Sequence, residues 1–270
     1  MKKVLIIGAG ESGLGCALLA NKYSHEVFVS DINKINNKTK MIFSDEGINF
    51  EEESHENAKI YSPDIVIKSP GISDENKIIK YLRSKSYKII SEIEFASRYC
   101  KSIIIAVTGS NGKTTTSSLI HEIIFNSNFT SSISGNIGKS FSSVCDADID
   151  YSIVEVSSFQ LDSIQKFRPH IAILTAITPD HLDRYQSFED YVKSKFRIAM
   201  NQTKQDFLIY DGDCKIISSF LKLNKIKSEL LPYSTNKKFK KGSYKLNNKI
   251  HIINGKNNID MPIDNFTITK

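Results

Sequence analysis

The sequence predicts an α/β protein of two domains, each built on a parallel β-sheet with helices on its faces. Short apolar runs alternate with helix-compatible segments through the first 200 residues. Two glycine-rich loops, at residues 8–13 and 109–112, each follow an apolar run and open a helix-like segment. The 270 residues are 40% hydrophobic, which is enough for one or two hydrophobic cores.

The first predicted domain covers residues 1–95. We expect strands at 4–7, 27–30, 65–67 and 88–90, with helices at 12–23 and 74–84. This alternation is typical of a parallel sheet. The start of the chain is similar to a signal peptide, but its apolar run is short and leads directly into a glycine loop, so we interpret it as the first strand. A polar stretch at 92–101 joins the two domains.

The second predicted domain covers residues 96–270. We expect strands at 103–108, 152–156 and 171–175, and helices at 114–126 and about 187–201. Ser187 and Asp190 have the spacing of a capping box at the start of the last helix. Weaker signals indicate strands at 206–211 and 249–253, and no residue after 205 carries chemistry that we can identify.

Charge and cysteine usage narrow the possible partners. The net charge is +6, and residues 201–270 hold 13 Lys against 6 Asp and Glu. This basic tail lacks aromatic residues spaced for base stacking, so we predict a solvated surface and no nucleic-acid partner. No apolar run reaches the roughly 18 residues of a membrane span. Cys16, Cys100, Cys145 and Cys214 show no metal-ligand spacing, which favours reduced thiols in the cytoplasm.

The second glycine loop is the most informative motif. It reads Gly109-Ser110-Asn111-Gly112-Lys113-Thr114-Thr115. A glycine loop between a strand and a helix presents backbone N–H groups to phosphate, while the lysine adds a cation and the threonine hydroxyl can hold Mg²⁺. A standard P-loop has a glycine five residues before Gly112, where this chain has Val107, so the loop is a short variant. These residues predict an ATP site.

The first glycine loop, Gly8-Ala9-Gly10-Glu11-Ser12-Gly13, precedes Asp31 at the end of the second strand. Alone it is a weak dinucleotide-binding fingerprint, and the domain is therefore expected to be Rossmann-like. Two loops of this kind indicate two phosphorylated ligands. That favours a transferase or ligase over a dehydrogenase.

Two polar residues follow predicted strands of the second domain. Glu155 lies where a P-loop protein places a Mg²⁺ ligand, although it could be a strand-end surface carboxylate. His181 lies in a loop with Asp180 and Asp183. It could ligate a metal through a neutral ring nitrogen or be a structural histidine.

Four motifs in this order resemble the bacterial Mur ligases. Residues 108–114 are similar to their ATP loop, and 134–138 to their substrate loop. Residues 155–161 and 180–185 are typical of the member that adds D-glutamate to UDP-N-acetylmuramoyl-L-alanine. The resemblance covers about residues 4–200.

The resemblance implies an enzyme of peptidoglycan precursor synthesis, and hence of cell-wall biogenesis, cell shape and cell division. ATP would phosphorylate the substrate carboxylate, and the amine of D-glutamate would displace phosphate from the acyl phosphate. The implied cofactors are ATP and Mg²⁺. The implied catalytic residues are Lys113, Glu155, His181 and Lys195, with Thr114, Glu155, His181 and Lys195 at the metal sites.

Lys195 matches a family lysine that is carbamylated. The alternative is a surface lysine on an amphipathic helix beside Lys193. The resemblance also implies a set of substrate-binding residues. They are Glu11, Ser12, Asp31, Ile32, Asn33, Ser69, Pro70, Gly71, Asn136, Ser157 and Gln160. Three positions depart from the family pattern: Ala176 replaces an Asn, Ser140 a Pro, and Asn33 a basic residue of some relatives.

Family members carry a third domain that supplies the D-glutamate pocket. We therefore expect this chain to be a truncated central-domain sequence, a split enzyme with a separate C-terminal domain chain, or a disrupted gene product, and to be inactive alone. Two other interpretations stay open. One is another Mur or folylpolyglutamate-type ligase, and the other is a non-catalytic nucleotide-binding module or an NAD-dependent oxidoreductase.

Overall fold

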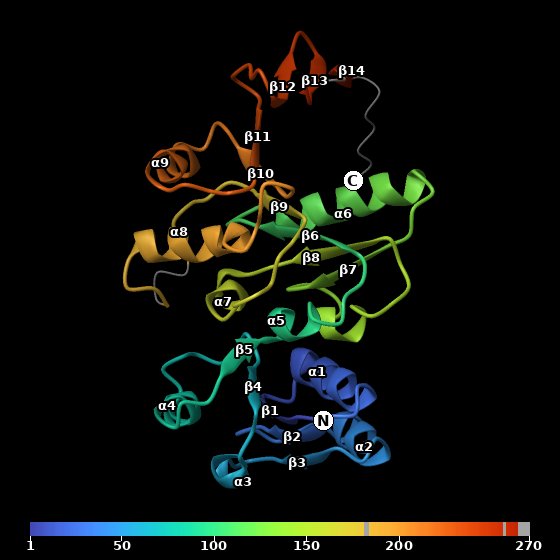
Figure 1. Cartoon of the computed structure of the whole chain (residues 1–270), viewed down its shortest axis with the longest axis vertical. Helices are drawn as coiled ribbons and strands as arrows, with labels where there is room; N and C mark the ends of the chain where they lie inside the picture. Colours follow the sequence, from blue (N-terminus) through green and yellow to red (C-terminus); the bar gives the residue numbers. More distant parts are fainter. Residues whose placement is uncertain (181–183, 256–257, 264–270) are drawn as a thin grey trace.

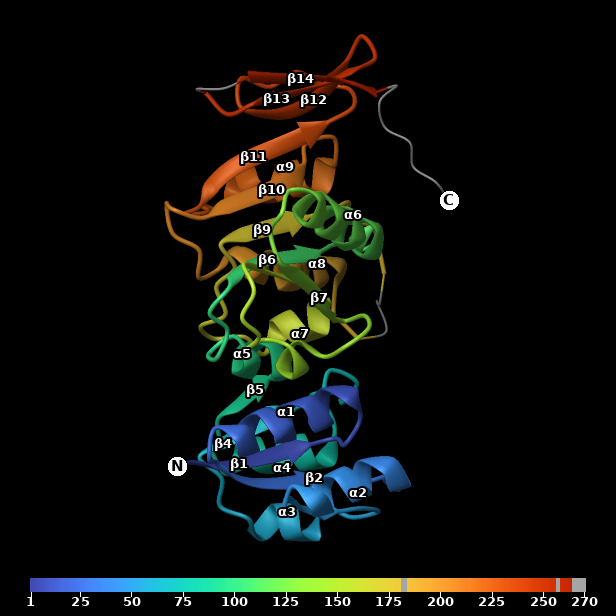
Figure 2. The ribbon, with the colours of Figure 1, turned by 90° about the vertical axis from the view of Figure 1, so that its right-hand side faces the viewer.

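The computed structural model describes residues 1–180, 184–255 and 258–263. The two domains follow one another along the longest axis of the molecule, each with its own sheet (Figure 1; Figure 2). The predicted α/β class is confirmed.

The sheet of the first domain has the strand order β3-β2-β1-β4-β5, and all its pairs are parallel. Its strands are β1 (Lys3–Ile7), β2 (Glu26–Ser30), β3 (Asn49–Glu51), β4 (Ile65–Lys68) and β5 (Ile89–Ser91). Its helices are α1 (Glu11–Lys22), α2 (Asn37–Asp45), α3 (Glu56–Ile60) and α4 (Lys77–Ser84). The four predicted strands and two predicted helices are present.

The sequence did not indicate α2, β3 or α3. Only Thr39 and Phe43 of α2 are buried, and β3 and α3 have one buried residue each, Glu51 and Ala58. Elements this short and this exposed leave almost no apolar period in the sequence. They become visible only from their packing on the sheet.

The sheet of the second domain has the order β14-β13-β12-β11-β10-β9-β6-β8-β7. It is parallel from β7 to β12, and β12, β13 and β14 pair antiparallel. The strands are β6 (Ile103–Thr108), β7 (Ser131–Gly135), β8 (Tyr151–Glu155), β9 (Ile171–Leu174), β10 (Phe207–Asp211), β11 (Glu229–Ser234), β12 (Gly242–Leu246), β13 (Lys249–Ile253) and β14 (Asn258–Pro262). All the strands predicted for this domain are confirmed.

Helices cover both faces of this sheet. They are α6 (Lys113–Asn126), α7 (Ser158–Asp162), α8 (Phe188–Phe196) and α9 (Lys215–Leu223), with 3₁₀ turns η1 (Phe141–Ser143) and η2 (Arg197–Ala199). In Figure 1, α6 lies on one side of the strands and α8 and α9 lie on the other. Ser187 caps α8 as predicted, because its side chain accepts a hydrogen bond from the Asp190 N–H.

The stretch expected to be a polar link contains a buried helix, α5 (Glu92–Ala96). Its acidic residues accept hydrogen bonds from backbone groups of the second domain. Glu94 accepts from three consecutive N–H groups, those of Gln165, Lys166 and Phe167, at 2.7–2.9 Å. The acidic residues were the reason for expecting a polar link. In the structure, Glu92 and Glu94 instead accept hydrogen bonds from buried backbone N–H groups.

The two domains share one hydrophobic cluster that runs from β1 to α9. Helix α1 packs on η1, and Cys16 Sγ lies 3.2 Å from Ser142 Oγ. On the side of the glycine loops, Arg184 donates to the Gly71 carbonyl at 3.1 Å. Loops of the second domain therefore reach the first-domain turn predicted to bind substrate.

Among the described residues, no helix combines the length and the apolar character that a membrane span requires.

Candidate active site

The loop between β6 and α6 is held in one shape by its glycines. Gly109 has φ +153°, and a Cβ there would lie 1.7 Å from Thr175 Oγ1. Gly112 has φ +82° and precedes the first turn of α6. Thr175 Oγ1 donates to the Asn111 carbonyl at 2.7 Å, and the Ser110 N–H donates to the Ala176 carbonyl at 2.9 Å. The loop is thus fastened to the end of β9, with no space for a side chain at Gly109.

Lys113 is the first residue of α6, and its ammonium lies over this loop. Its Nζ donates to the Gly109 and Ser110 carbonyls at 3.1 Å each. The free N–H groups of a helix N-terminus and a lysine at the same place favour an anion. Thr115, also predicted to bind ATP, is exposed in the same first turn.

Three predicted residues meet beside the loop. The Thr114 hydroxyl donates to Glu155 Oε2 at 2.8 Å, and the Asn136 amide donates to Glu155 Oε1 at 3.0 Å. Glu155 ends β8 and is only 1% exposed, so the alternative of a surface carboxylate is wrong. The Thr114 hydroxyl and the Glu155 carboxylate are hard oxygen groups of the kind that Mg²⁺ binds in proteins.

Lys195 approaches the same loop from α8. Its Nζ donates to the Gly109 carbonyl at 2.8 Å and lies 4.6 Å from the centre of the Tyr191 ring. The residue is 2% exposed, so the alternative of a surface lysine is wrong. Burial, together with the positive charge of Lys113, lowers the pKa of Lys195 to about 7. Part of the amine is therefore neutral near pH 7.

The predicted second metal ligand, His181, lies outside the described residues. Across residues 1–180, 184–255 and 258–263, no group of three or more His, Cys, Asp or Glu side chains is arranged to hold a metal ion. The carboxylate that hydrogen-bonds to Thr114 at the start of α6 is that of Glu155, and the charges of Asp180 and Asp162 act on the buried Lys195.

Ser157 and Gln160 form a capping box at the start of α7. The Gln160 N–H donates to Ser157 Oγ at 3.3 Å, and the Ser157 N–H donates to Gln160 Oε1 at 2.9 Å. These bonds fix the turn that follows Glu155. A contact of either residue with substrate stays a prediction.

The eight substrate-binding residues predicted in the first domain line one cavity of about 410 Å³. Asp31 shapes it, because one carboxylate oxygen accepts the Ala9 N–H at 2.7 Å and the other accepts the Asn33 N–H at 2.9 Å. A Cβ on Gly13 would lie 1.8 Å from the Gly8 carbonyl. The glycine loop and the loop after β2 are thus joined through Asp31.

The same cavity is lined by residues that the sequence did not single out, among them His55 and Asn76. His55 precedes the unpredicted helix α3. Asn76 is the N-cap of α4, where its side chain accepts the Ile78 N–H. An Asn near the start of the predicted helix was a signal for a cap, but no local pattern placed it in a cavity.

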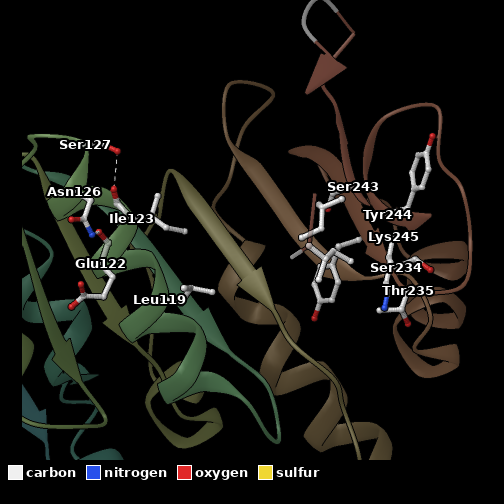
Figure 3. A pocket seen from close by; sticks show the side chains of 13 residues that line it. Leu119, Glu122, Ile123, Asn126, Ser127, Ser234, Thr235, Ser243, Tyr244 and Lys245 are labelled. Carbon is white, nitrogen blue, oxygen red and sulfur yellow. Dashed lines mark hydrogen bonds between the residues drawn. The ribbon is translucent and has the colours of Figure 1, made fainter. Parts of the chain in front are cut away.

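A different cavity, of about 800 Å³, lies between α6 and strands β11–β13 (Figure 3). Leu119 and Ile123 of α6 lie on one side, with Ser243 and Tyr244 of β12 on the other. None of the residues predicted to act in catalysis or binding lines it. We assign no ligand to it.

Fold and site together define an α/β protein with a P-loop-type glycine loop on its second domain and a separate cavity on a Rossmann-like first domain. Comparison with family models gives a match to the Mur ligase middle domain over residues 107–264, and to the MurD N-terminal domain over residues 3–78. The chain belongs to the Mur ligase family.

Two relatives, both named UDP-N-acetylmuramoylalanine–D-glutamate ligase, illustrate the similarity. The protein of Christiangramia forsetii is 46% identical over 97% of this chain and 59% of its own length. A protein of Bacteroides fragilis is 46% identical over 87% of this chain and 53% of its own length. The chain thus spans less than two thirds of the length of these relatives.

Solved structures with this fold are more distant in sequence. A UDP-N-acetylmuramate:L-alanyl-gamma-D-glutamyl-meso-diaminopimelate ligase from Neisseria meningitides has a TM-score of 0.63 at 16% identity, covering 95% of this chain and 85% of that one. A murein peptide ligase from Psychrobacter arcticus has a TM-score of 0.62 at 17% identity, covering 100% and 62%. These two likenesses concern the fold alone.

Proposed function

We propose that the chain serves the ATP-dependent joining of D-glutamate to UDP-N-acetylmuramoyl-L-alanine, a step of peptidoglycan precursor synthesis. The names of the two relatives that are 46% identical to this chain support this choice of substrates. The observation that carries the proposal is the meeting of Lys113, Thr114, Glu155 and Lys195 at one glycine loop, with distances of 2.8–3.1 Å. The segment after β9 accepts the Ser110 N–H at the Ala176 carbonyl, and Arg184, further along the chain, donates to the Gly71 carbonyl of the first-domain cavity.

A free carboxylate is a poor acyl donor, so the reaction needs an activated form of it. In the proposed sequence, a carboxylate oxygen of the muramoyl substrate attacks the γ-phosphorus of ATP, and the bond to ADP breaks. The amine of D-glutamate then attacks the acyl carbon, phosphate leaves, and the nitrogen loses a proton. Lys113 and the N–H groups at the start of α6 would stabilise charge on the transferred phosphoryl group.

The residues present fit Mg²⁺, because the Thr114 hydroxyl and the Glu155 carboxylate already touch at the start of α6. Thr114 and Glu155 would hold it, and a bound Mg²⁺ would neutralise phosphate charge. His181 stays a predicted ligand outside the described residues.

We further propose that Lys195 is carbamylated. The ammonium group would first lose one proton, and the neutral amine would then attack CO₂, forming a nitrogen–carbon bond and releasing a second proton. The charge of the side chain thus changes from +1 to −1. Two ammonium groups, those of Lys113 and Lys195, share the Gly109 carbonyl, and their repulsion is relieved when one becomes negative. In a complete enzyme, Lys195→Ala should nearly abolish ligation.

The UDP part of the substrate is proposed to occupy the first-domain cavity, and Asn136 to contact the muramoyl part. We also propose a cytoplasmic location, which the free thiols of Cys16, Cys100, Cys145 and Cys214 support.

Calorimetric titration tests both sites separately. The chain should bind a non-hydrolysable ATP analogue in the presence of Mg²⁺, and UDP-N-acetylmuramoyl-L-alanine independently of it. Lys113→Ala and Glu155→Gln should each weaken the nucleotide at least tenfold and leave the UDP ligand unaffected. Lys222→Ala, an exposed lysine on α9, is the matched control.

Unchanged nucleotide affinity in Lys113→Ala would contradict the ATP site. Binding of NAD in place of the UDP ligand would favour the oxidoreductase alternative.

A further inference from the structure

The cavity of about 800 Å³ between α6 and strands β11–β13 has apolar residues on both sides (Figure 3). Leu119 and Ile123 of α6 form one side, and they are 53% and 58% exposed. Tyr244 of β12 and Ile250 of β13 lie on the other side. We call this cavity the α6 groove. Exposed apolar side chains that gather in a groove mark a place where a peptide segment can dock.

Helix α6 carries apolar side chains on two faces. Ile120 and Ile124 pack against the sheet, whereas Leu119 and Ile123, one turn apart, lie in the groove. Ser117 is the one buried residue among the 14 of α6. The stability of a helix in a protein comes mainly from packing of its apolar face. A segment that covered the groove would therefore complete the packing of α6.

The two sides of the groove also carry opposite charges. Glu122 lies on α6 beside Ile123, and Lys245 lies on β12 (Figure 3). Both residues are exposed, and within residues 1–180, 184–255 and 258–263 neither forms an ion pair. A segment that matches the groove therefore brings a cation to the α6 side and an anion to the strand side.

The sequence after Ile263 has these properties. Ile263 lines the groove, and its N–H donates at 2.9 Å to the carbonyl of Asn248, in the turn between β12 and β13. The next seven residues read Asp264-Asn265-Phe266-Thr267-Ile268-Thr269-Lys270. An anion comes first and a cation last. Because Phe266 and Ile268 alternate with threonines, an extended segment of this sequence has both apolar side chains on one face.

We propose that residues 264–270 dock in the α6 groove as an extended segment. Phe266 and Ile268 pack against the two apolar residues of α6. Seven extended residues span up to roughly 23 Å, while Leu119 and Ile123 are one helical turn, about 6 Å, apart. The segment is therefore long enough to cross from the strands to α6 and to cover both residues.

The charges determine the direction of this segment. Asp264 follows Ile263 directly and so lies on the strand side, near Lys245. Lys270, at the other end, reaches the α6 side, where Glu122 is exposed. Because the segment is tethered at the groove, its effective concentration there is higher than that of a separate partner. The inference does not depend on the proposed function.

Amide hydrogen exchange of the full chain, followed by mass spectrometry, tests the docking. The double variant Phe266→Ser/Ile268→Ser removes the apolar face of the segment. Peptides that cover residues 117–126 of α6 should exchange about tenfold faster in this variant than in the unmodified chain, because two apolar contacts with the helix are lost. Peptides that cover β6 should exchange alike in both, which verifies that the variant is folded.

Thr267→Lys is the matched control. In an extended segment residue 267 lies on the face opposite to Phe266 and Ile268, so this variant should leave the exchange of α6 unchanged. Lys245→Glu should accelerate the exchange of α6 about threefold, the scale of an exposed ion pair. Adding Asp264→Lys to Lys245→Glu should restore slow exchange, because the two charges are then interchanged.

Equal exchange of α6 in the unmodified chain and in the double variant would overturn the inference. So would a rate in Thr267→Lys as fast as in the double variant, because the apolar face of the segment would then not matter. Exchange that slows as the protein concentration rises would show that a second copy of the chain covers the groove, which also contradicts the inference.

Discussion

Lys193 and Lys195 lie two positions apart on α8, yet they are in opposite environments. The Lys193 side chain is 56% exposed and pairs with Glu189 at 2.9 Å. Lys195 is buried against the glycine loop, and its pKa is lowered to about 7. The helical period places one on the solvent side and the other on the sheet side. Only the second lysine is chemically available as a neutral amine near pH 7.

This difference predicts a ¹³C carbamate signal when the chain is equilibrated with ¹³C-labelled bicarbonate and observed by NMR. The signal should grow between pH 6 and pH 8, roughly one unit either side of the Lys195 pKa, because the reactive amine fraction rises. It should persist in Lys193→Met and vanish in Lys195→Met. A signal of equal size in Lys195→Met would assign it to another amine.

Asp206 illustrates a residue with a purely structural role. It is 1% exposed and accepts from Arg168 at 2.8 Å and from the Thr203 N–H at 2.6 Å, with His170 Nδ1 at 3.0 Å. Burial alone would raise its pKa, but these partners together hold the pKa of Asp206 well below its usual range. A carboxyl with a depressed native pKa stabilises the fold above its unfolded value of about 3.9 and loses that effect as pH falls further.

We therefore expect Asp206→Asn to lower the free energy of unfolding at pH 7 by about 2 kcal/mol, the scale of hydrogen bonds to a charged group. The difference in the free energy of unfolding between this variant and the unmodified chain should become smaller as pH falls below about 4. Urea denaturation at several pH values measures this difference. A gap that is independent of pH would contradict the assigned ionisation.

At the scale of one element, α5 carries two buried carboxyls with opposite behaviour. Glu92 Oε1 accepts from the Ser142 N–H at 2.6 Å, and burial dominates and raises the pKa of Glu92. Burial also acts on Glu94, but three backbone N–H groups and Arg98 outweigh it and lower the pKa of Glu94. Whether a buried carboxyl ionises thus depends on how many donors surround it.

The pair predicts opposite pH effects in two matched variants. Because the native pKa of Glu92 is raised, stability falls as pH rises above the unfolded value of about 4.3. Glu92→Gln has no carboxyl to ionise at this position, so its stability does not fall in this way as pH rises. The variant should therefore become more stable than the unmodified chain as pH approaches 7. Glu94→Gln should be less stable at pH 7, with the difference fading toward about pH 4.

Urea midpoints at a series of pH values distinguish the two variants. If both lost stability equally at pH 7, the inferred ionisation of Glu92 would be wrong.

On the scale of the whole molecule, the two domains are joined by one apolar cluster rather than by a mobile linker. Phe141 of η1 is fully buried in that cluster, while α1 and α5 of the first domain pack against the same turn. The two ligand cavities are thus held on one rigid support. A shared core of this kind predicts that both domains unfold together.

Chemical unfolding followed by circular dichroism should show a single transition. Phe141→Ala should cost about 3–5 kcal/mol, the range for deleting a buried aromatic ring, and separate the transition into two. Phe129→Ala, with a ring 49% exposed, should change stability by less than about 0.5 kcal/mol. Two transitions in the unmodified chain would show that the domains are independent.

The sequence by itself determined the α/β class, the main strands, the two glycine loops and the order of the family motifs. These features follow from local pattern: apolar period, glycine at turns, and Lys-Thr at a helix start. It did not predict α2, β3 or α3, because short exposed elements leave no period. The sequence also predicted a polar link where the structure has the buried helix α5, because acidic residues are usually solvated.

The tertiary structure alone decided the electrostatic state of the site. Lys113 and Lys195 are 82 positions apart, and they meet because the glycine loop that opens α6 lies against α8, so that both ammonium groups donate to the Gly109 carbonyl. Ser30 Oγ, at the end of β2, lies 2.7 Å from Glu51 Oε1 of β3 and 2.6 Å from His55 Nδ1, so three separate segments meet at one hydroxyl. Burial and partners set a pKa, and both are products of contacts between distant segments, which no local pattern of residues contains.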